Sequence, residues 1–151
     1  LSKANINDII NIIRPIGTFN KKASNIINIS KSLLEEKNGI VPNDRIYLES
    51  LPGVGRKTAN VFLSNIYDEP AIAVDTHVAR VSKRLGISNY DDSVLDVEMR
   101  LMELIDENKW HQSHHLLLFF GRYFCLAKKP NCENCFYKKS CTFYNDKNLQ
   151  D

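Results

Sequence analysis

Residues 51–60 decide the fold, and they read Leu51-Pro52-Gly53-Val54-Gly55-Arg56-Lys57-Thr58-Ala59-Asn60. Two glycines one residue apart permit a tight turn with positive φ, and the proline pre-sets one of its backbone angles. The helix that follows such a turn presents backbone N–H groups that have no intrahelical acceptor. The stretch therefore predicts two helices joined by a glycine hairpin, with the start of the second helix turned outward.

A helix start of this kind binds a phosphate without needing side-chain charge. The hairpin is therefore a candidate for sequence-independent contact with a DNA backbone. The alternative is a plain turn between two helices. The residues expected to make the contact are Leu51, Gly53, Val54, Gly55, Arg56 and Thr58.

Apolar residues elsewhere in the chain recur with helical spacing, as at Ile6, Ile9, Ile10 and Ile13. No segment shows the sustained alternation of a strand. The pattern predicts an all-α protein with helices at residues 6–13, 24–36, 45–50, 56–67, 75–84, from 91 and at 111–124. The expected domains are a helical lobe at 1–69 that contains the hairpin, a second helical lobe at 70–144, and a polar tail at 145–151.

The bulk properties exclude several classes of protein. The 151 residues carry a formal net charge of +2, with 43% hydrophobic and 25% charged residues, which rules out a histone-like polycation. No apolar run approaches the length of a membrane span, and no secretory signal opens the chain. We therefore expect a cytoplasmic protein without a membrane partner; the family resemblance described below implies that it is bacterial.

Lys57 falls in the first turn of the helix after the hairpin. The helix dipole disfavours a cation there, which lowers the pKa of the amine toward what a nucleophilic lysine needs. The alternatives are a lysine that contacts phosphate or one that is only solvated. Lys57 is thus a candidate catalytic nucleophile.

Asp75 lies 18 positions later, after the apolar run Ala71–Val74, and is expected to cap the helix that follows it. Capping fixes a carboxylate and is compatible with catalysis. With a lobe boundary near Pro70, Lys57 and Asp75 are expected to face each other across a cleft. A carboxylate there raises the lysine pKa, so burial, the helix start and Arg56 must offset it. Arg80, on the helix after Asp75, is a candidate phosphate contact.

Four cysteines follow near the end of the chain: Cys125, Cys132, Cys135 and Cys141. Four thiolates in a short loop can hold one [4Fe–4S] cluster or one zinc ion, and the spacing alone leaves both open. Two disulfides are the alternative, disfavoured in a chain without a secretory signal. Lys128 and Lys129, inside the loop, are expected to track DNA phosphates or simply to keep the loop solvated.

Together and in this order, the hairpin, Lys57, Asp75 and the cysteines resemble the endonuclease III family of DNA base-excision glycosylases. Blocks at residues 16–23, 51–60, 72–81 and 121–123 resemble family segments, as does the cysteine spacing. The resemblance implies two helical lobes around a DNA cleft and a structural [4Fe–4S] cluster on the four cysteines. It also implies a monomer that acts on double-stranded DNA with a damaged base or an abasic site, near the nucleoid.

The activity that the resemblance implies is removal of oxidised pyrimidines. Lys57 would attack the sugar C1′, expel the base and form a Schiff base, and β-elimination would then cut the strand. Asp75 would stabilise charge on the sugar and assist proton transfer. Lys57 also separates the chain from adenine DNA glycosylases, which resemble this scaffold but lack the lysine.

The chain departs from the family in ways that motivate two further hypotheses. Members of the family begin well upstream of the position that corresponds to Leu1 of this chain. We therefore expect this chain to be a fragment of a longer protein or an inactive form of the enzyme. A non-catalytic DNA-binding module that uses the same hairpin and cluster is the first hypothesis, and a zinc-stapled structural domain is the second. Leu116 and Phe120 replace a common tryptophan and histidine, changes expected to affect packing alone.

Overall fold

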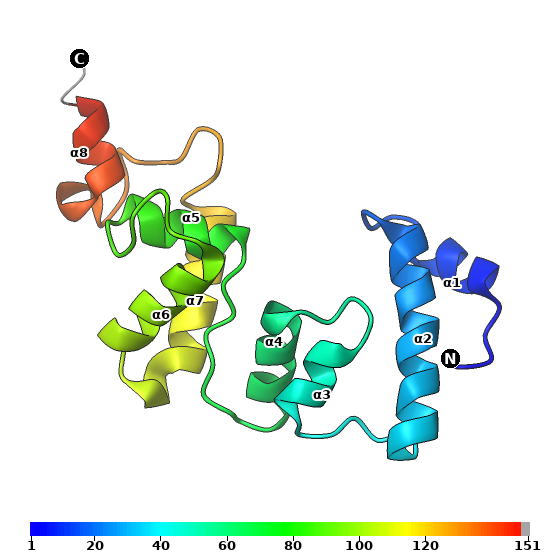
Figure 1. The fold of residues 1–151 in the computed structure, drawn as a ribbon. Helices are drawn as coiled ribbons and strands as arrows, with labels where there is room; N and C mark the ends of the chain where they lie inside the picture. Colours follow the sequence, from blue (N-terminus) through cyan, green and yellow to red (C-terminus); the bar gives the residue numbers. More distant parts are fainter. Residues whose placement is uncertain (149–151) are drawn as a thin grey trace. The chain divides into compact units, whose positions relative to one another are not determined.

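The structure is a computed structural model that describes residues 1–148, and every regular element in that range is a helix (Figure 1). The α-helices are α1 (Ile6–Ile13), α2 (Phe19–Lys37), α3 (Arg45–Ser50), α4 (Arg56–Ile66), α5 (Thr76–Arg84), α6 (Val94–Leu104), α7 (Trp110–Tyr123) and α8 (Thr142–Asn148). Two short 3₁₀ turns lie at Glu107–Lys109 and Lys138–Ser140. The all-α prediction is confirmed. None of the described helices is long and apolar enough to cross a membrane.

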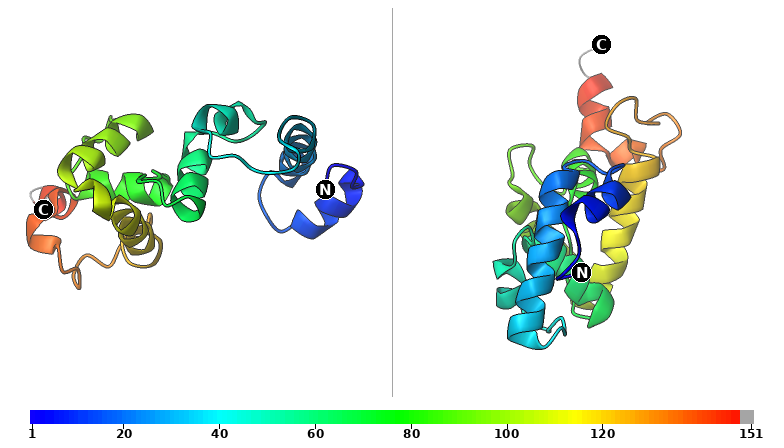
Figure 2. Two further views of the ribbon diagram at one scale, coloured as in Figure 1. Left: turned by 90° about the horizontal axis from the view of Figure 1, so that it is seen from below. Right: turned by 90° about the vertical axis from the view of Figure 1, so that its right-hand side faces the viewer.

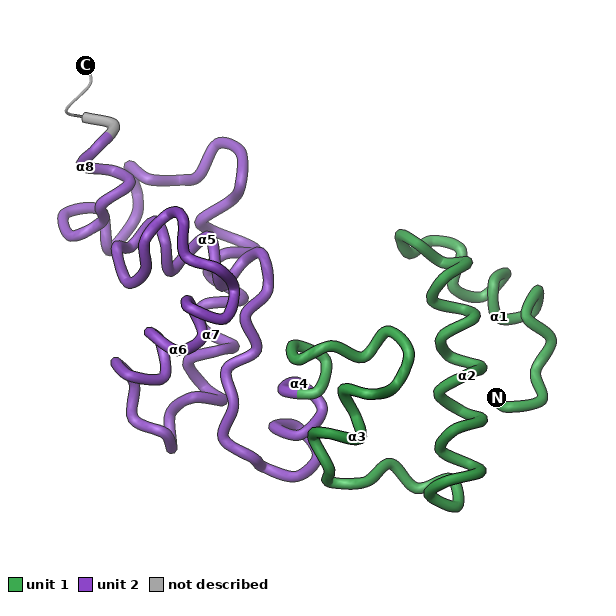
Figure 3. Tube along the Cα trace, in the orientation of Figure 1, with its two compact units in different colours: residues 1–59 green, residues 60–151 purple. Residues whose placement is uncertain are grey.

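Contacts group the chain into two compact units, the first being Leu1–Ala59 and the second beginning at Asn60 (Figure 3). The division falls inside α4, whereas the predicted boundary lies in the loop that follows this helix. A loop is the natural place to look for a boundary in a sequence, but a helix can also pass from one compact unit to the next. The lobes at 1–69 and 70–144 stay a prediction.

In the first unit, α1 packs against α2, and the two lie side by side in both views of Figure 2. Ile9 on α1 and Ala23 on α2 are both buried, and Ala23 is fully so. α2 begins at Phe19, five residues before the predicted start at residue 24. Because Ala23 is buried, packing extends the helix beyond the point that local helix-start residues indicate.

The second unit is built on a core of Ile72, Val74, Val78, Val97 and Leu101, each no more than 3% exposed. These residues come from the extended segment before α5, from α5 and from α6. α7 packs against α5 over the greatest length, while α6 and α8 contact α5 elsewhere (Figure 1). α5 is therefore the central helix of the unit, and the residue at its start is held by the core.

Gly121 on α7 allows the close approach of α5. A Cβ at this position would lie 3.0 Å from the backbone oxygen of His77 and 3.0 Å from a methyl group of Val81. We therefore expect Gly121→Ala to reduce the free energy of unfolding by about 1–3 kcal/mol, because a backbone oxygen has little room to move. Chemical denaturation measures the change. Gly17→Ala is the control, since nothing lies within 4 Å of its new Cβ; equal stability of the two variants would contradict the packing argument.

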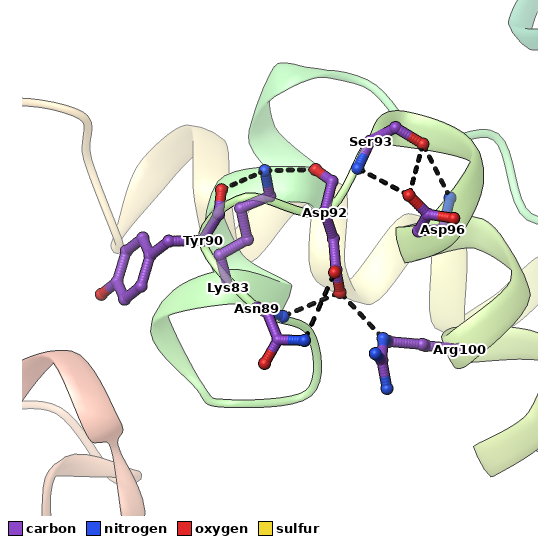
Figure 4. A network of polar contacts seen from close by, with 7 residues as sticks. All are labelled: Lys83, Asn89, Tyr90, Asp92, Ser93, Asp96 and Arg100. Carbon is purple, nitrogen blue, oxygen red and sulfur yellow. Dashed lines mark hydrogen bonds and ion pairs between the residues drawn. The ribbon is translucent and has the colours of Figure 1, made fainter.

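The turn between α5 and α6 is held by a network of polar side chains (Figure 4). Lys83 donates from Nζ to the carbonyl oxygens of Tyr90, at 2.8 Å, and Asp92, at 2.6 Å. The Asp92 carboxylate accepts from the Asn89 amide and from Arg100 Nε, both at 2.8 Å. The Asn89 backbone bond is the main cause that lowers the pKa of Asp92. This network anchors the start of α6.

The end of the described chain differs from the polar tail predicted from residue 145. α8 begins at Thr142 and continues to Asn148, and residues 149–151 lie outside the described part. Tyr144 donates from its hydroxyl to the Glu133 carboxylate, and the Arg84 guanidinium lies 4.3 Å from the centre of the Phe143 ring. These tertiary contacts favour a helix that local polarity does not indicate.

Candidate active site and cysteine centre

The glycine hairpin forms as predicted between α3 and α4. Asp44 caps α3 by accepting from the Tyr47 amide at 3.0 Å, and α3 ends at Ser50. Gly53 has a φ of +81°, the left-handed conformation that a side chain strains. The Val54 amide donates to the Leu51 carbonyl at 3.1 Å and closes the turn.

The second half of the hairpin is exposed to solvent. Gly53 and Gly55 are exposed, as are the first three residues of α4, Arg56, Lys57 and Thr58. Leu51 is buried and Val54 is half-buried, so their side chains anchor the turn. Because the first amides of a helix lack intrahelical acceptors, this arrangement can receive a phosphate oxygen.

Asp75 caps α5, which confirms that part of the prediction. Its Oδ1 accepts from the amides of His77 and Val78, both at 2.8 Å. The side chain is half-buried, and the four residues before it, 71–74, are buried. Both cap bonds end on Oδ1, so Oδ2 lies outside the cap. Lys57 belongs to the first compact unit and Asp75 to the second.

Arg80 makes more internal contacts than a surface phosphate contact requires. Its Nη2 donates to the Gly121 carbonyl at 2.5 Å, and its Nε and Nη2 donate to the Cys125 carbonyl at 3.1 and 3.0 Å. Nη2 also lies 3.3 Å from Nδ1 of His77. These bonds tie α5 to the end of α7 and the start of the cysteine loop. The phosphate contact of Arg80 stays a prediction beside this structural role.

The four cysteines are free thiols, and all of them line one pocket. Within residues 1–148, no three His, Cys, Asp or Glu side chains are grouped closely enough to hold a single metal ion. Four thiols that share one pocket can serve as ligands of one metal centre.

Arg84 is the buried cation of the cysteine centre. Its Nη1 donates to Cys125 Sγ at 3.3 Å and to the Leu126 carbonyl at 2.7 Å, and Nη2 donates to the Ala127 carbonyl at 3.1 Å. The Cys141 thiol donates to the Arg84 carbonyl at 3.2 Å. The residue therefore fixes both ends of the cysteine loop on α5.

The electrostatics of the pocket favour a bound cation. Burial raises the pKa of the Cys132 thiol, the three other cysteines raise it further, and Arg84 lowers it. Four thiolates gathered here repel one another, and one guanidinium does not balance them. Lys128 and Lys129 are exposed on the same loop, with Lys129 in the left-handed conformation at φ +52°.

His114 lies on α7 next to the segment that ends at Asp75. It is 8% exposed, and its Nδ1 has no hydrogen-bond partner among the described residues. Burial is the main cause that lowers the pKa of His114, and the charge of His115 adds to it. The Asp75 charge and a hydrogen bond with the Ala73 backbone act in the opposite direction. The net direction keeps the His114 ring neutral.

This shift predicts acid sensitivity of the folded state. As the pH falls through about 6.5, the unfolded chain binds a proton at residue 114 before the folded chain does. Stability is therefore full above the unfolded pKa and is lost below it, by at most about 1.4 kcal/mol per pH unit. We expect His114→Gln to flatten the dependence of the unfolding free energy between pH 7 and 5. Parallel profiles for variant and native chain would show that another group causes the sensitivity.

Four buried polar residues of the second unit were not identified from the sequence as parts of the site: Asn60, Glu98, Arg84 and His114. Glu98 did carry a signal, because it falls on the apolar side of α6 between Val97 and Leu101, where a carboxylate is unexpected. For Arg84 there was no signal, since its partners are carbonyls and a thiol more than 40 residues away.

Comparison with known proteins supports the same family as the sequence motifs do. The family model of the HhH-GPD superfamily base excision DNA repair proteins matches residues 1–107. Endonuclease III of Bacillus subtilis (strain 168) is 54% identical over 123 residues, which cover 82% of this chain and 56% of that protein. The chain therefore spans little more than half the length of this curated relative.

Two solved structures of endonuclease III with DNA are similar to the chain. A non-covalent complex superposes with a TM-score of 0.93 at 46% identity, covering 99% of this chain and 70% of the other. A trapped covalent intermediate superposes with a TM-score of 0.92 at 46% identity, and the match covers 97% of this chain and 68% of the other. The match over nearly the whole chain confirms the fold expected from the resemblance. The chain belongs to the HhH-GPD superfamily of base excision DNA repair proteins, and its similarity there is to endonuclease III.

Proposed function

We propose that this chain carries a DNA glycosylase activity coupled to an abasic-site lyase activity, directed at oxidised pyrimidines in double-stranded DNA. The observation that carries the proposal is the 46% identity, over 97% of the chain, to an endonuclease III trapped as a covalent intermediate with DNA. The chain supplies an exposed lysine at a helix start and a carboxylate fixed by a cap. Both are required by a mechanism that forms a covalent bond to the sugar.

Lys57 is the proposed nucleophile. Its neutral amine attacks C1′ as the bond to the damaged base breaks, and the base leaves with the electron pair and takes up a proton. The bound amine loses one proton, and the ring oxygen O4′ takes up a proton as the C1′–O4′ bond breaks, which leaves a protonated Schiff base. Loss of a proton from C2′ then drives out the 3′ phosphate, and water releases the sugar and regenerates the amine. The target nucleotide must leave the stack for this attack.

Asp75 is the proposed carboxylate partner. Its Oδ2, outside the helix cap, would stabilise positive charge on the sugar and accept the proton that the amine loses. Because Oδ1 is held by two amides, the carboxylate needs no reordering when the substrate arrives. Capping and catalysis thus use different oxygens of the same side chain.

The separate roles of the two oxygens predict different behaviour for two substitutions. Asp75→Asn retains an oxygen that can accept the cap bonds, so we expect near-native stability with a rate lower by about 10²–10⁴-fold. Asp75→Ala loses the cap as well, and we expect a further loss of about 0.5–2 kcal/mol in unfolding free energy. Single-turnover strand cleavage and thermal unfolding measure the two effects. An active Asp75→Asn enzyme would exclude the carboxylate from the chemistry.

The DNA contacts follow from the exposed backbone and lysines. The hairpin residues Leu51, Gly53, Val54, Gly55, Arg56 and Thr58 would hold phosphates of one strand, with Leu51 and Val54 shaping the turn because their own amides donate to the Leu48 and Leu51 carbonyls. Lys128, Lys129 and Arg80 would add contacts from the second unit. The partner would be double-stranded DNA at the nucleoid of a bacterial cytoplasm, bound by a monomer.

The cofactor that fits the cysteine pocket best is a [4Fe–4S] cluster held by Cys125, Cys132, Cys135 and Cys141. The thiols share one pocket, and their mutual repulsion would be relieved by a cationic iron core. When bound, the cluster would supply a structural cross-link for the loop that carries Lys128 and Lys129. Its chemistry is not part of the proposed reaction.

The activity is tested by following base release and strand cleavage separately on a duplex with one oxidised pyrimidine. We expect both to occur with the same rate-limiting step. Base release without cleavage would exclude the lyase step. Binding without either reaction would support the non-catalytic DNA-binding module.

A further inference from the structure

We propose that Asn60 and Glu98 are positioning residues for Asp75. They would act by holding the extended segment of residues 71–75, which ends at the carboxylate. This inference rests on the proposed function, because it gives Asp75 a role in the reaction. It adds two residues that neither touch the substrate nor belong to the hairpin, and it gives a role to a carboxyl group that is buried in α6.

The contact is a three-way junction between elements of the second unit. Asn60 on α4 donates from Nδ2 to the Ile72 carbonyl at 3.2 Å and to Glu98 Oε1, on α6, also at 3.2 Å. The three residues are 2%, 0% and 3% exposed, in the order Asn60, Ile72, Glu98. A carboxamide nitrogen carries two hydrogens. One therefore goes to the segment and the other to the carboxylate.

The segment needs such a contact because it is neither helix nor strand. A buried backbone carbonyl without a partner is costly, and no sheet ladder exists within the described residues to satisfy Ile72. Asn60 supplies the missing donor. Glu98 fixes the rotation of the Asn60 amide, since only one orientation gives a donor to both oxygens.

A displacement of the Ile72 backbone would also change the position of the Asp75 carboxylate. The two residues are three positions apart on an extended backbone, and Ile72 and Val74 are both locked in the core. Because Asp75 starts α5, a shift of the segment also changes where Oδ1 meets the His77 and Val78 amides. A misplacement of about 1 Å in a reacting group can cost roughly 10²-fold in rate.

Stability alone is a weak reason for this arrangement. A buried carboxylate loses its hydration, and apolar side chains of similar size often stabilise a core at least as well. A carboxylate that orients an amide on the backbone before Asp75 has a geometric role that leucine cannot fill. Glutamine can fill it in part, because its side-chain oxygen accepts the same hydrogen bond.

The experiment compares substitutions at Glu98 in the full chain with its cysteine centre loaded. Glu98→Leu removes the acceptor, Glu98→Gln keeps it, and Asn60→Ala breaks both bonds should Glu98→Leu not fold. Glu98→Gln is also the matched control, since it differs from Glu98→Leu in keeping the acceptor and leaves the core around Ile72 and Val74 intact. We expect Glu98→Leu to slow single-turnover cleavage by roughly 10–100-fold with DNA affinity within about twofold. Glu98→Gln should restore most of the rate.

A double-mutant cycle with Asp75→Asn separates positioning from general destabilisation. If Glu98 acts through Asp75, Glu98→Leu slows the Asp75→Asn enzyme by no more than about twofold. Full additivity of the two losses would overturn the proposal, as would an equal loss of rate in Glu98→Gln.

A second readout does not depend on activity. Hydrogen exchange at the His77 and Val78 amides reports the bonds to Asp75 Oδ1, and it should accelerate in Glu98→Leu but not in Glu98→Gln. If the native chain forms no product, the proposed function fails while this exchange still tests the positioning. Unchanged exchange in Glu98→Leu would overturn the positioning whatever the activity.

Discussion

Lys57→Ala should abolish covalent capture of the sugar and reduce strand cleavage by roughly three orders of magnitude or more. Removal of a nucleophile deletes the step on which all later steps depend, so its effect exceeds that of any single contact. Because Lys57 is exposed in the first turn of α4, its loss leaves no cavity, and the fold should be retained. Single-turnover kinetics on an oxidised-pyrimidine duplex measure the effect.

Arg56→Ala is the matched control for this substitution. Arg56 is the neighbouring exposed cation in the same helical turn, so both variants lose one positive charge near the DNA. The loss of a phosphate contact lowers affinity and the salt dependence of binding but leaves the bound complex reactive. If Lys57→Ala cleaves DNA as fast as Arg56→Ala does, Lys57 is a phosphate contact and not the nucleophile.

Cys132→Ala should prevent loading of the cysteine centre and destabilise the second unit. The other three cysteines cannot complete the proposed four-thiolate set, and structural metal centres contribute on the order of 10 kcal/mol to folding in small domains. We expect iron to fall from about four atoms per chain to near zero, together with the broad visible absorbance. Thermal unfolding and iron analysis measure both losses.

The native chain decides between the candidates for this centre. A colourless protein that contains one zinc ion would contradict the cluster and support a zinc-stapled domain. Ser140→Ala is a suitable control because the residue lies beside Cys141, is exposed and donates from its hydroxyl to the nearby Tyr137 carbonyl. Loss of iron in that variant as well would point to general damage of the loop.

The parts of the fold that were predicted correctly depend on local chemistry. The glycine pair placed the hairpin, and Asp75 was identified as a cap because its side chain reaches amides two and three residues ahead. The heptad-like spacing of Ile6, Ile9 and Ile13 gave α1 its bounds. Each of these features involves atoms that are close in sequence, where spacing alone is informative.

The parts that were missed depend on contacts between distant segments. Arg84 reaches a loop more than 40 residues away, and Glu98 meets Asn60 across 38 residues. Nothing in the neighbourhood of either residue specifies its partner. The helix α8 was missed for the same reason, because Phe143 and Tyr144 contact residues outside their own segment.

The most direct test of the proposed chemistry is borohydride trapping on a duplex that carries a single thymine glycol. Borohydride reduces a Schiff base to a stable amine, so an enzyme that uses Lys57 should be captured on the DNA as a covalent adduct. We expect the native chain to form this adduct and Lys57→Ala to form none. The absence of an adduct with folded, cluster-loaded native protein would contradict the lyase mechanism.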